Sequence, residues 1–218
     1  MQERFVKKHV YTVGHSTHPF ERFAHLLETH SITAIADVRS SPYSRVNPQF
    51  NRESLAEKLR ERGIGYVFLG KELGARSNDP ACYRDGKAQY ELIAKTALFE
   101  QGITRVLSGA DKHKVALMCA EKDPIECHRA ILVGRTLNEK GMEVSHILAD
   151  GKIETQEELV QRLLVKLEIH TKDMFSPREA LAQEAYRIQG EAIAYQENVA
   201  QEKGDGKAEP EGKKVVAN

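Results

Sequence analysis

The sequence has no tryptophan, only three cysteines and no excess of either charge, since 32 Lys and Arg residues balance 32 Asp and Glu residues among 218 positions. Balanced charge argues against general attraction to nucleic acid or to an anionic membrane, although a local basic face is still compatible with it. Three cysteines supply neither a disulfide framework nor a CxxC pair for a zinc ribbon. The composition therefore excludes disulfide-stabilised and strongly basic classes of protein.

Long apolar segments are also absent. No segment approaches the run of about 18 apolar residues that a membrane helix needs. Residues 1–16 carry charges within their apolar stretch and lack the apolar core of a signal peptide. We therefore expect a cytoplasmic protein without membrane contact, in which the cysteines are reduced.

Short β-branched segments alternate along the chain with segments of helical periodicity. This alternation predicts an α/β fold with flanking helices and a mostly parallel, open, Rossmann-like sheet of about five strands. The predicted strands are residues 10–13, 32–38, 66–69, 115–119 and 144–148.

The segment after residues 115–119 carries clear signals for the start of a helix. Asp123 suits the capping position, Pro124 the first helical position and Glu126 the third. These signals predict one continuous helix that ends at Lys140, before Gly141. In such a helix, Cys127 lies just past the first turn.

The chain divides into an α/β domain at 1–168, a C-terminal helical extension at 169–203 and a disordered tail at 204–218. Residues 155–158 and 176–179 both have the pattern of a capping box. An apolar stripe in the second of these helices covers either the protein's own domain or a second copy, so a homo-oligomer is an alternative. The stripe consists of Leu181, Ala185, Ile188, Ala192 and Tyr195.

Ligands of open parallel sheets bind beyond the carboxyl ends of the strands. The polar residues that follow the predicted strands therefore give the candidate site. We assign catalytic roles to Cys127, Glu121 and His128. The candidates for substrate binding are His15, Ser16, Asp37, Arg39, Ser41, Cys119 and Arg129.

Cys127 is the candidate nucleophile, because a helix N-terminus favours a thiolate and Arg129 adds positive charge. The phosphatase loop is excluded, since the sixth residue after Cys127 is Val133 and not arginine. A binding role for the segment, or simple core packing of the thiol, remains open. Glu121 is a candidate base, hydroxyl acceptor, metal ligand or ion-pair partner.

Metal binding requires three or four ligands that converge. His15, Cys119, Cys127, His128 and His146 meet this requirement only through the fold, because they have no local ligand spacing. We therefore assign no metal ligand. The cofactor also stays unassigned, since the GxGxxG, P-loop, HExxH and GxSxG motifs are all absent.

Five short motifs follow one another along the chain: residues 11–16 (YTVGHS), 37–39 (DVR), 72–74 (ELG), 117–121 (LMCAE) and 127–129 (CHR). Together they resemble the bacterial and archaeal family called domain of unknown function four-eight-eight. The resemblance covers residues 10–165 and implies a single cytoplasmic α/β domain whose polar motifs form its site. It implies no activity, although some relatives carry a DNA-repair label.

The sequence therefore suggests an enzyme that acts on a phosphate-containing substrate, such as a nucleotide, a nucleic acid or a phosphorylated metabolite. In this hypothesis Arg39 and Arg129 hold the anionic group. One alternative is a non-catalytic nucleotide- or nucleic-acid-binding module linked to DNA repair. Another is a protein–protein adaptor that works through its C-terminal helix.

Overall fold

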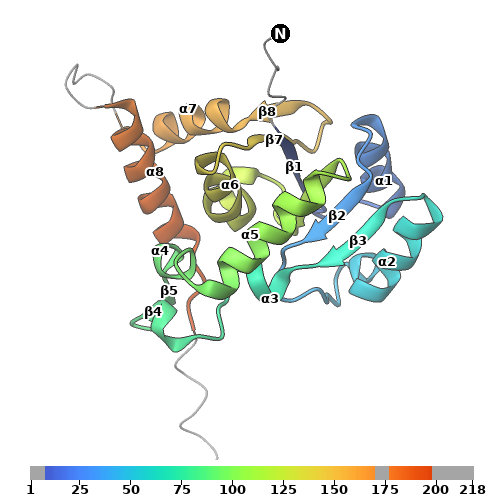
Figure 1. Cartoon of the computed structure of the whole chain (residues 1–218), viewed down its shortest axis with the longest axis horizontal. Helices are drawn as coiled ribbons and strands as arrows, with labels where there is room; N and C mark the ends of the chain where they lie inside the picture. The colour runs from blue at the N-terminus through green and yellow to red at the C-terminus, as the bar shows by residue number, and fades with distance from the viewer. Residues whose placement is uncertain (1–7, 170–176, 198–218) are drawn as a thin grey trace, which may run out of the picture.

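A six-stranded sheet forms the centre of the molecule (Figure 1). The computed structural model describes residues 8–169 and 177–197. All five predicted strands are present and parallel, and a short sixth strand pairs antiparallel at one edge. The prediction missed this strand because three residues carry too little pattern. The strands are β1 (His9–Gly14), β2 (Ala34–Asp37), β3 (Gly65–Phe68), β6 (Val115–Cys119), β7 (Glu143–Ile147) and β8 (Ile153–Thr155).

The strand order is β3-β2-β6-β1-β7-β8. A Rossmann sheet places its first two strands side by side, whereas β6 separates β1 from β2 here. The Rossmann-like part of the prediction is therefore not confirmed. Because β6 lies between β1 and β2, its carboxyl end lies between the carboxyl ends of these two strands. Cys119 is therefore beside Gly14, and Met118 is beside Asp37.

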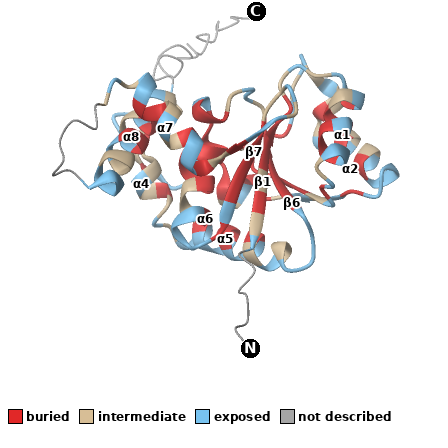
Figure 2. Cartoon of the chain, turned by 90° about the horizontal axis from the view of Figure 1, so that it is seen from above, coloured by how far each residue is buried: buried red, intermediate tan, exposed pale blue. Residues whose placement is uncertain are grey.

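Helices cover both faces of the sheet, which is buried between them (Figure 2). Two helices, α1 (Phe20–Thr29) and α2 (Arg52–Glu61), pack on one face. The opposite face contacts α3 (Gly70–Leu73), α5 (Ala97–Ala110) and the segment before α6 (Arg135–Glu139). Every residue of β6 is buried, as its continuous apolar sequence predicted.

The segment between the third and fourth predicted strands contains two helices. They are α4 (Tyr90–Ile93) and α5, and the side chain of Thr96 caps α5 by accepting from the Phe99 backbone N–H. Leu98 of α5 is exposed. Smaller elements lie between the strands and helices: η1 (Pro48–Phe50), η2 (Pro80–Cys82), β4 (Tyr83–Arg84) and β5 (Lys87–Ala88).

The continuous helix predicted over 124–140 is wrong. A single 3-10 turn, η3 (Pro124–Glu126), is followed by Cys127 in an extended conformation, with φ −138° and ψ 135°. A π-helical segment, η4 (Arg129–Gly134), then leads into α6. Asp123 caps the first turn as predicted, since its side chain accepts from the Ile125 N–H. Cys127 therefore precedes a second helical segment rather than lying inside the first.

Two helices close the described part of the chain. The first is α7 (Gln156–Lys166), which begins with the predicted capping box of Thr155 and Glu158. The second is α8 (Arg178–Ile193), which packs on α7, η3 and η4 of the same chain through Ala185 and Tyr186. Ser176 of the second predicted capping box and the predicted tail at 204–218 lie outside the described residues.

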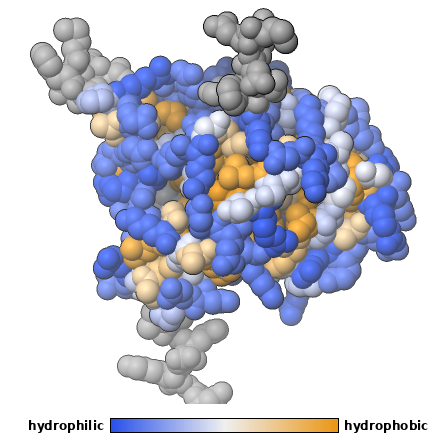
Figure 3. All heavy atoms as spheres, in the orientation of Figure 1, coloured by the Kyte–Doolittle hydropathy of each residue, from blue (hydrophilic) through white to orange (hydrophobic). Residues whose placement is uncertain are grey.

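Hydrophilic side chains cover most of the face shown in Figure 3, and apolar side chains gather in its middle. A groove of about 220 Å³ lies between α5 and strands β2 and β3, lined in part by Ala34, Val67 and Val106. Among the residues that the structure describes, every helix is too short or too polar to cross a membrane.

A candidate metal centre at the end of strand β6

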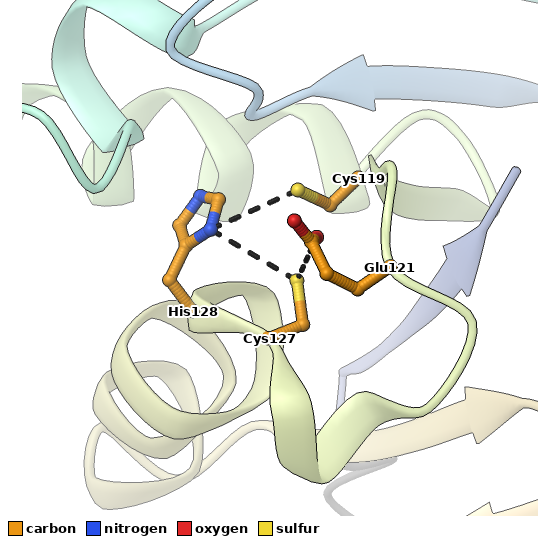
Figure 4. Close-up of side chains that lie close together, drawn as sticks. All are labelled: Cys119, Glu121, Cys127 and His128. Atoms are coloured by element: carbon orange, nitrogen blue, oxygen red, sulfur yellow. Dashed lines mark hydrogen bonds between the residues drawn. The ribbon is translucent and has the colours of Figure 1, made fainter. Parts of the chain in front are cut away.

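Four side chains converge where β6 ends (Figure 4). They belong to Cys119, Glu121, Cys127 and His128, and their potential ligand atoms all lie within 4.8 Å of one another. Cys119 is the last residue of β6, Glu121 lies in the following turn, and the other two directly precede η4. We call these four residues the Cys/Glu/His cluster.

The turn that carries Glu121 is held by a buried arginine. The Arg129 guanidinium donates to the Glu121 carbonyl at 2.7 Å and to the Lys122 carbonyl at 3.2 Å. Arg129 is completely buried. Its side chain therefore fixes the backbone of the cluster, whereas the sequence suggested that it binds a substrate anion.

Cys127 is positioned by the start of the helical segment that follows it. Its carbonyl accepts from the backbone N–H groups of Ala130 and Ile131 at 3.1 Å each. Its sulfur accepts from the backbone N–H of Arg129 at 3.4 Å. The sulfur thus sits where a capping side chain usually sits, close to unpaired N–H groups and their partial positive charge.

The imidazole of His128 is oriented by a backbone carbonyl. Nε2 lies 2.9 Å from the Val38 oxygen, which only accepts hydrogen bonds, so Nε2 carries a proton. Nδ1 faces the sulfurs of Cys119 at 3.7 Å and Cys127 at 3.9 Å. This is the usual arrangement of a metal-binding histidine, in which a backbone oxygen holds the ring nitrogen opposite the metal.

The two sulfurs differ in how readily they ionise. Burial raises the pKa of the Cys119 thiol, and the neighbouring Cys127 adds to this effect. Burial opposes ionisation of Cys127 as well, but contacts with Cys119, Arg129 and His128 outweigh it and lower its pKa. One negative charge therefore resides mainly on Cys127.

The Glu121 carboxylate turns inward although the residue as a whole is exposed. One of its oxygens lies 2.8 Å from the Cys127 sulfur, with a single proton between the two groups. Burial of the carboxylate, followed by the charge of Cys127, raises its pKa. Glu121 and Cys127 thus share one proton. A bound cation would displace this proton and contact both groups in their ionised forms.

Two predicted site residues at the end of β1 lie beside the cluster without joining it. The backbone N–H groups of His15 and Ser16 donate to the carbonyls of Cys119 and Ala120. The His15 ring stacks on Phe50 with centroids 4.3 Å apart, and burial lowers its pKa to about 4. His15 is therefore neutral and supports the end of the sheet.

Asp37 and Arg39 form a separate buried ion pair at the end of β2. The Arg39 guanidinium donates to both Asp37 oxygens, at 2.9 and 2.6 Å, and to the Phe50 carbonyl at 2.9 Å. The Tyr66 hydroxyl also donates to Asp37, a contact that sequence reasoning missed. Ser41 is exposed and lies beyond this pair.

The remaining histidine considered as a metal ligand lies elsewhere. His146 bonds to Thr12 and Gln156 and is completely buried. Among the predicted residues, the structure brings together the three proposed catalytic side chains and Cys119. A signal for this set exists in the sequence as C-x-E-x5-C-H over residues 119–128.

The fold and the cluster define an α/β protein with a buried sulfur, nitrogen and oxygen donor set at the end of its central strand. A family model described as "Domain of unknown function DUF488" matches residues 19–136, more than half of the chain, and the chain belongs to this family. The matched range contains all four cluster residues. Searches of curated proteins and of solved structures gave no match.

Proposed function

We propose that the protein binds one divalent transition-metal ion through Cys119, Glu121, Cys127 and His128. The observation that supports this proposal is the convergence of their four ligand atoms within 4.8 Å of one another. Two thiolates, an imidazole and a carboxylate are the ligands that zinc prefers, and zinc imposes little geometric preference of its own. Zinc is therefore the ion that this donor set fits best.

Burial and support of the ligands agree with this function. Cys119, Cys127 and His128 are all buried, so they lose little conformational freedom when an ion binds. The Val38 carbonyl holds the His128 ring in the tautomer that presents Nδ1. Binding of the ion would displace the shared proton, so affinity is expected to rise with pH.

The metal content of the purified full chain tests the proposal. We expect one equivalent of zinc per chain, and loss of the metal in Cys127→Ser and His128→Asn. Cys82→Ala is the matched control, because Cys82 is also a buried free thiol but lies outside the cluster. Equal zinc content in Cys127→Ser and in the parent protein would contradict the proposal.

A second candidate is a thiol enzyme that acts on a phosphate-containing substrate, with Cys127 as the nucleophile. The lowered pKa of Cys127 and its place before η4 favour this candidate. The engaged guanidiniums of Arg39 and Arg129 and the burial of the thiol weigh against it. Turnover of phosphate esters by the metal-free protein, lost in Cys127→Ala, would favour this function over metal binding.

Two other functions receive less support. A non-catalytic nucleotide- or nucleic-acid-binding module would use basic side chains such as Arg45 and Arg76, and the Arg76 guanidinium lies 4.3 Å from the centre of the Tyr195 ring. An adaptor would use α8, whose apolar face packs on its own chain. Binding of a labelled oligonucleotide at physiological salt would favour the first of these.

A further inference from the structure

We infer that Glu121 is the exchangeable ligand of the metal centre, so that the ion offers one position to a small anionic donor. The inference rests on the metal binding proposed above and assigns unequal roles to the four ligands. Structural zinc sites keep four fixed protein ligands, whereas catalytic sites keep three and leave the fourth position to water or substrate. The inference gives the Cys/Glu/His cluster three fixed ligands, Cys119, Cys127 and His128, and one exchangeable ligand, Glu121.

Exposure separates Glu121 from the other three ligands. The exposed fractions of Cys119, Cys127 and His128 are 3%, 1% and 7%, while Glu121 is exposed. The Glu121 carboxylate faces the cluster while the residue lies at the surface, so an external molecule reaches the ion position when this side chain turns outward. It does not need to displace a buried side chain.

The three buried ligands are also fixed by contacts outside the cluster. Cys119 ends a central strand that pairs with β1 and β2, and His128 is held by the Val38 carbonyl. Cys127 is held by its carbonyl at the start of η4. In Glu121 the backbone carbonyl is held by Arg129, but the carboxylate contacts a cluster member, Cys127. Rotation of this side chain opens the ion without moving the backbone.

Charge defines the class of donor. A divalent ion with two thiolates and a neutral imidazole carries no net charge, and the Glu121 carboxylate adds one negative charge. A monoanionic oxygen or nitrogen donor replaces Glu121 with no change in this total. The buried Arg129 guanidinium, which donates to the Glu121 carbonyl, adds a positive charge beside this position.

Cobalt substitution and azide titration of the full chain test the inference. Cobalt(II) reports its ligands through its visible absorption spectrum, and azide is the monoanionic probe. We expect azide to change the spectrum of the parent protein in a saturable way. Glu121→Ala is expected to retain cobalt and to bind azide about tenfold more tightly, because the carboxylate no longer competes.

Two control variants show what the loss of a fixed ligand and the loss of an unrelated carboxylate look like in the same experiment. Cys127→Ser is expected to bind cobalt at least about 100-fold more weakly, since even changes to groups that support a ligand cost 10- to 100-fold. Glu126→Ala removes a nearby carboxylate that pairs with Lys166 and is expected to behave as the parent does. Glu121→Gln keeps the shape of the side chain and replaces Glu121→Ala if the latter does not fold.

The outcomes separate the inference from the proposed function. Failure of the parent protein to bind cobalt or zinc overturns both. Loss of cobalt from Glu121→Ala to the extent seen in Cys127→Ser overturns the inference alone, because Glu121 is then a fixed ligand. Retention of cobalt with a spectrum that azide leaves unchanged also overturns the inference alone, because the fourth position is then closed.

Discussion

Gly14 allows the end of β1 to approach the turn of the cluster. A Cβ atom on this residue would lie 1.9 Å from the Glu121 carbonyl oxygen and 3.2 Å from a nitrogen of the Arg129 guanidinium. Both neighbours are held by their mutual hydrogen bond, so neither can move cheaply. Only glycine fits this position.

Gly14→Ala is therefore expected to lower the free energy of unfolding by about 2–3 kcal/mol, the upper range for overpacked sites, and to reduce metal content. Gly109→Ala is the control, because its Cβ would meet nothing closer than 3.7 Å within α5. It should stabilise the protein by up to about 1 kcal/mol. Urea unfolding measures the free energy of unfolding of both variants. Equal changes for the two substitutions would contradict the packing argument.

His146 gives the protein a pH-dependent stability. Burial, together with the charge of Arg129, lowers its pKa to about 3. The ring is held neutral by two contacts, since Nε2 donates to Gln156 and Nδ1 accepts from Thr12. Below pH 6.5 the unfolded chain therefore binds a proton that the folded chain does not.

The free energy of unfolding therefore falls as pH drops from 6.5 toward 3. Above pH 6.5, His146 adds no pH dependence to the free energy of unfolding. Between pH 6.5 and 5, His146 should contribute a loss of about 2 kcal/mol, at about 1.4 kcal/mol per pH unit. Urea unfolding of His146→Gln should show a correspondingly smaller loss. His25→Gln is the control, because His25 is exposed. If the stability of the parent protein and of His146→Gln changes with pH in parallel, His146 does not contribute to the pH dependence.

The residues that could be predicted are those whose chemistry follows from their place at a strand end. Cys119, Glu121, Cys127 and His128 were all named as candidates in this way, because the carboxyl ends of parallel strands meet at one edge; the structure brings them together, and their roles stay predictions. The roles of Arg39 and Arg129 could not be predicted from the sequence. Their partners are Asp37 and backbone carbonyls, and only the folded chain shows that the guanidiniums are already engaged.

At the level of elements, the turn η3 determines where Cys127 begins the next helical segment. Asp123 has two functions in this turn: its side chain accepts from the Ile125 N–H and forms an ion pair with Arg162 at 2.8 Å. Arg162 also pairs with Glu154 and so connects η3 to α7 and β8. Two substitutions at Asp123 distinguish the contribution of the cap to stability from that of the ion pair.

Asp123→Asn keeps an oxygen for the cap and removes the charge, so a loss of less than about 1 kcal/mol is expected for this partly exposed pair. Asp123→Ala removes the cap too and should cost about 1 kcal/mol more. Metal affinity should follow the same order, because the cap fixes the approach to Cys127. Equal unfolding free energies and equal metal affinities for the two variants would show that the cap is not important.

Strands were predicted more accurately than the helix after β6. A buried parallel strand needs only a short continuous apolar segment, and 115–119 has one. Helix start signals specify the first turn but not the length. Here the Gln189 amide donates to the Ile125 carbonyl, which a continuous helix would have used internally. This contact comes from α8, far along the sequence, so local patterns could not reveal the break.

At the scale of the whole molecule, the strand order could not be predicted. The position of β6 between β1 and β2 depends on pairings between segments about 80 to 100 residues apart, for which the sequence carries no local signal. The class of the fold needs only the alternation of elements, whereas the order decides which strand ends are neighbours. This is why the α/β class was confirmed and the Rossmann-like order was not.

A buried chain of hydrogen bonds joins the sheet to the C-terminal helix. Thr12 of β1 bonds to His146 of β7, His146 to Gln156 of α7, and the Gln156 amide donates to the Tyr186 hydroxyl of α8 at 2.6 Å. If this chain connects the elements energetically, α8 unfolds together with the sheet. If it does not, α8 unfolds separately.

Tyr186→Phe distinguishes these cases, because it keeps the ring and leaves the buried Gln156 amide without its acceptor. The expected loss is about 1–3 kcal/mol. Tyr43→Phe removes a hydroxyl from a half-exposed tyrosine that donates to Glu53 and should change stability by less than about 0.5 kcal/mol. Hydrogen exchange should show the loss from Tyr186→Phe equally at the amides of β1 and α8. Faster exchange confined to α8 would instead show that the helix unfolds as a unit of its own, because the sheet would then keep its stability without it.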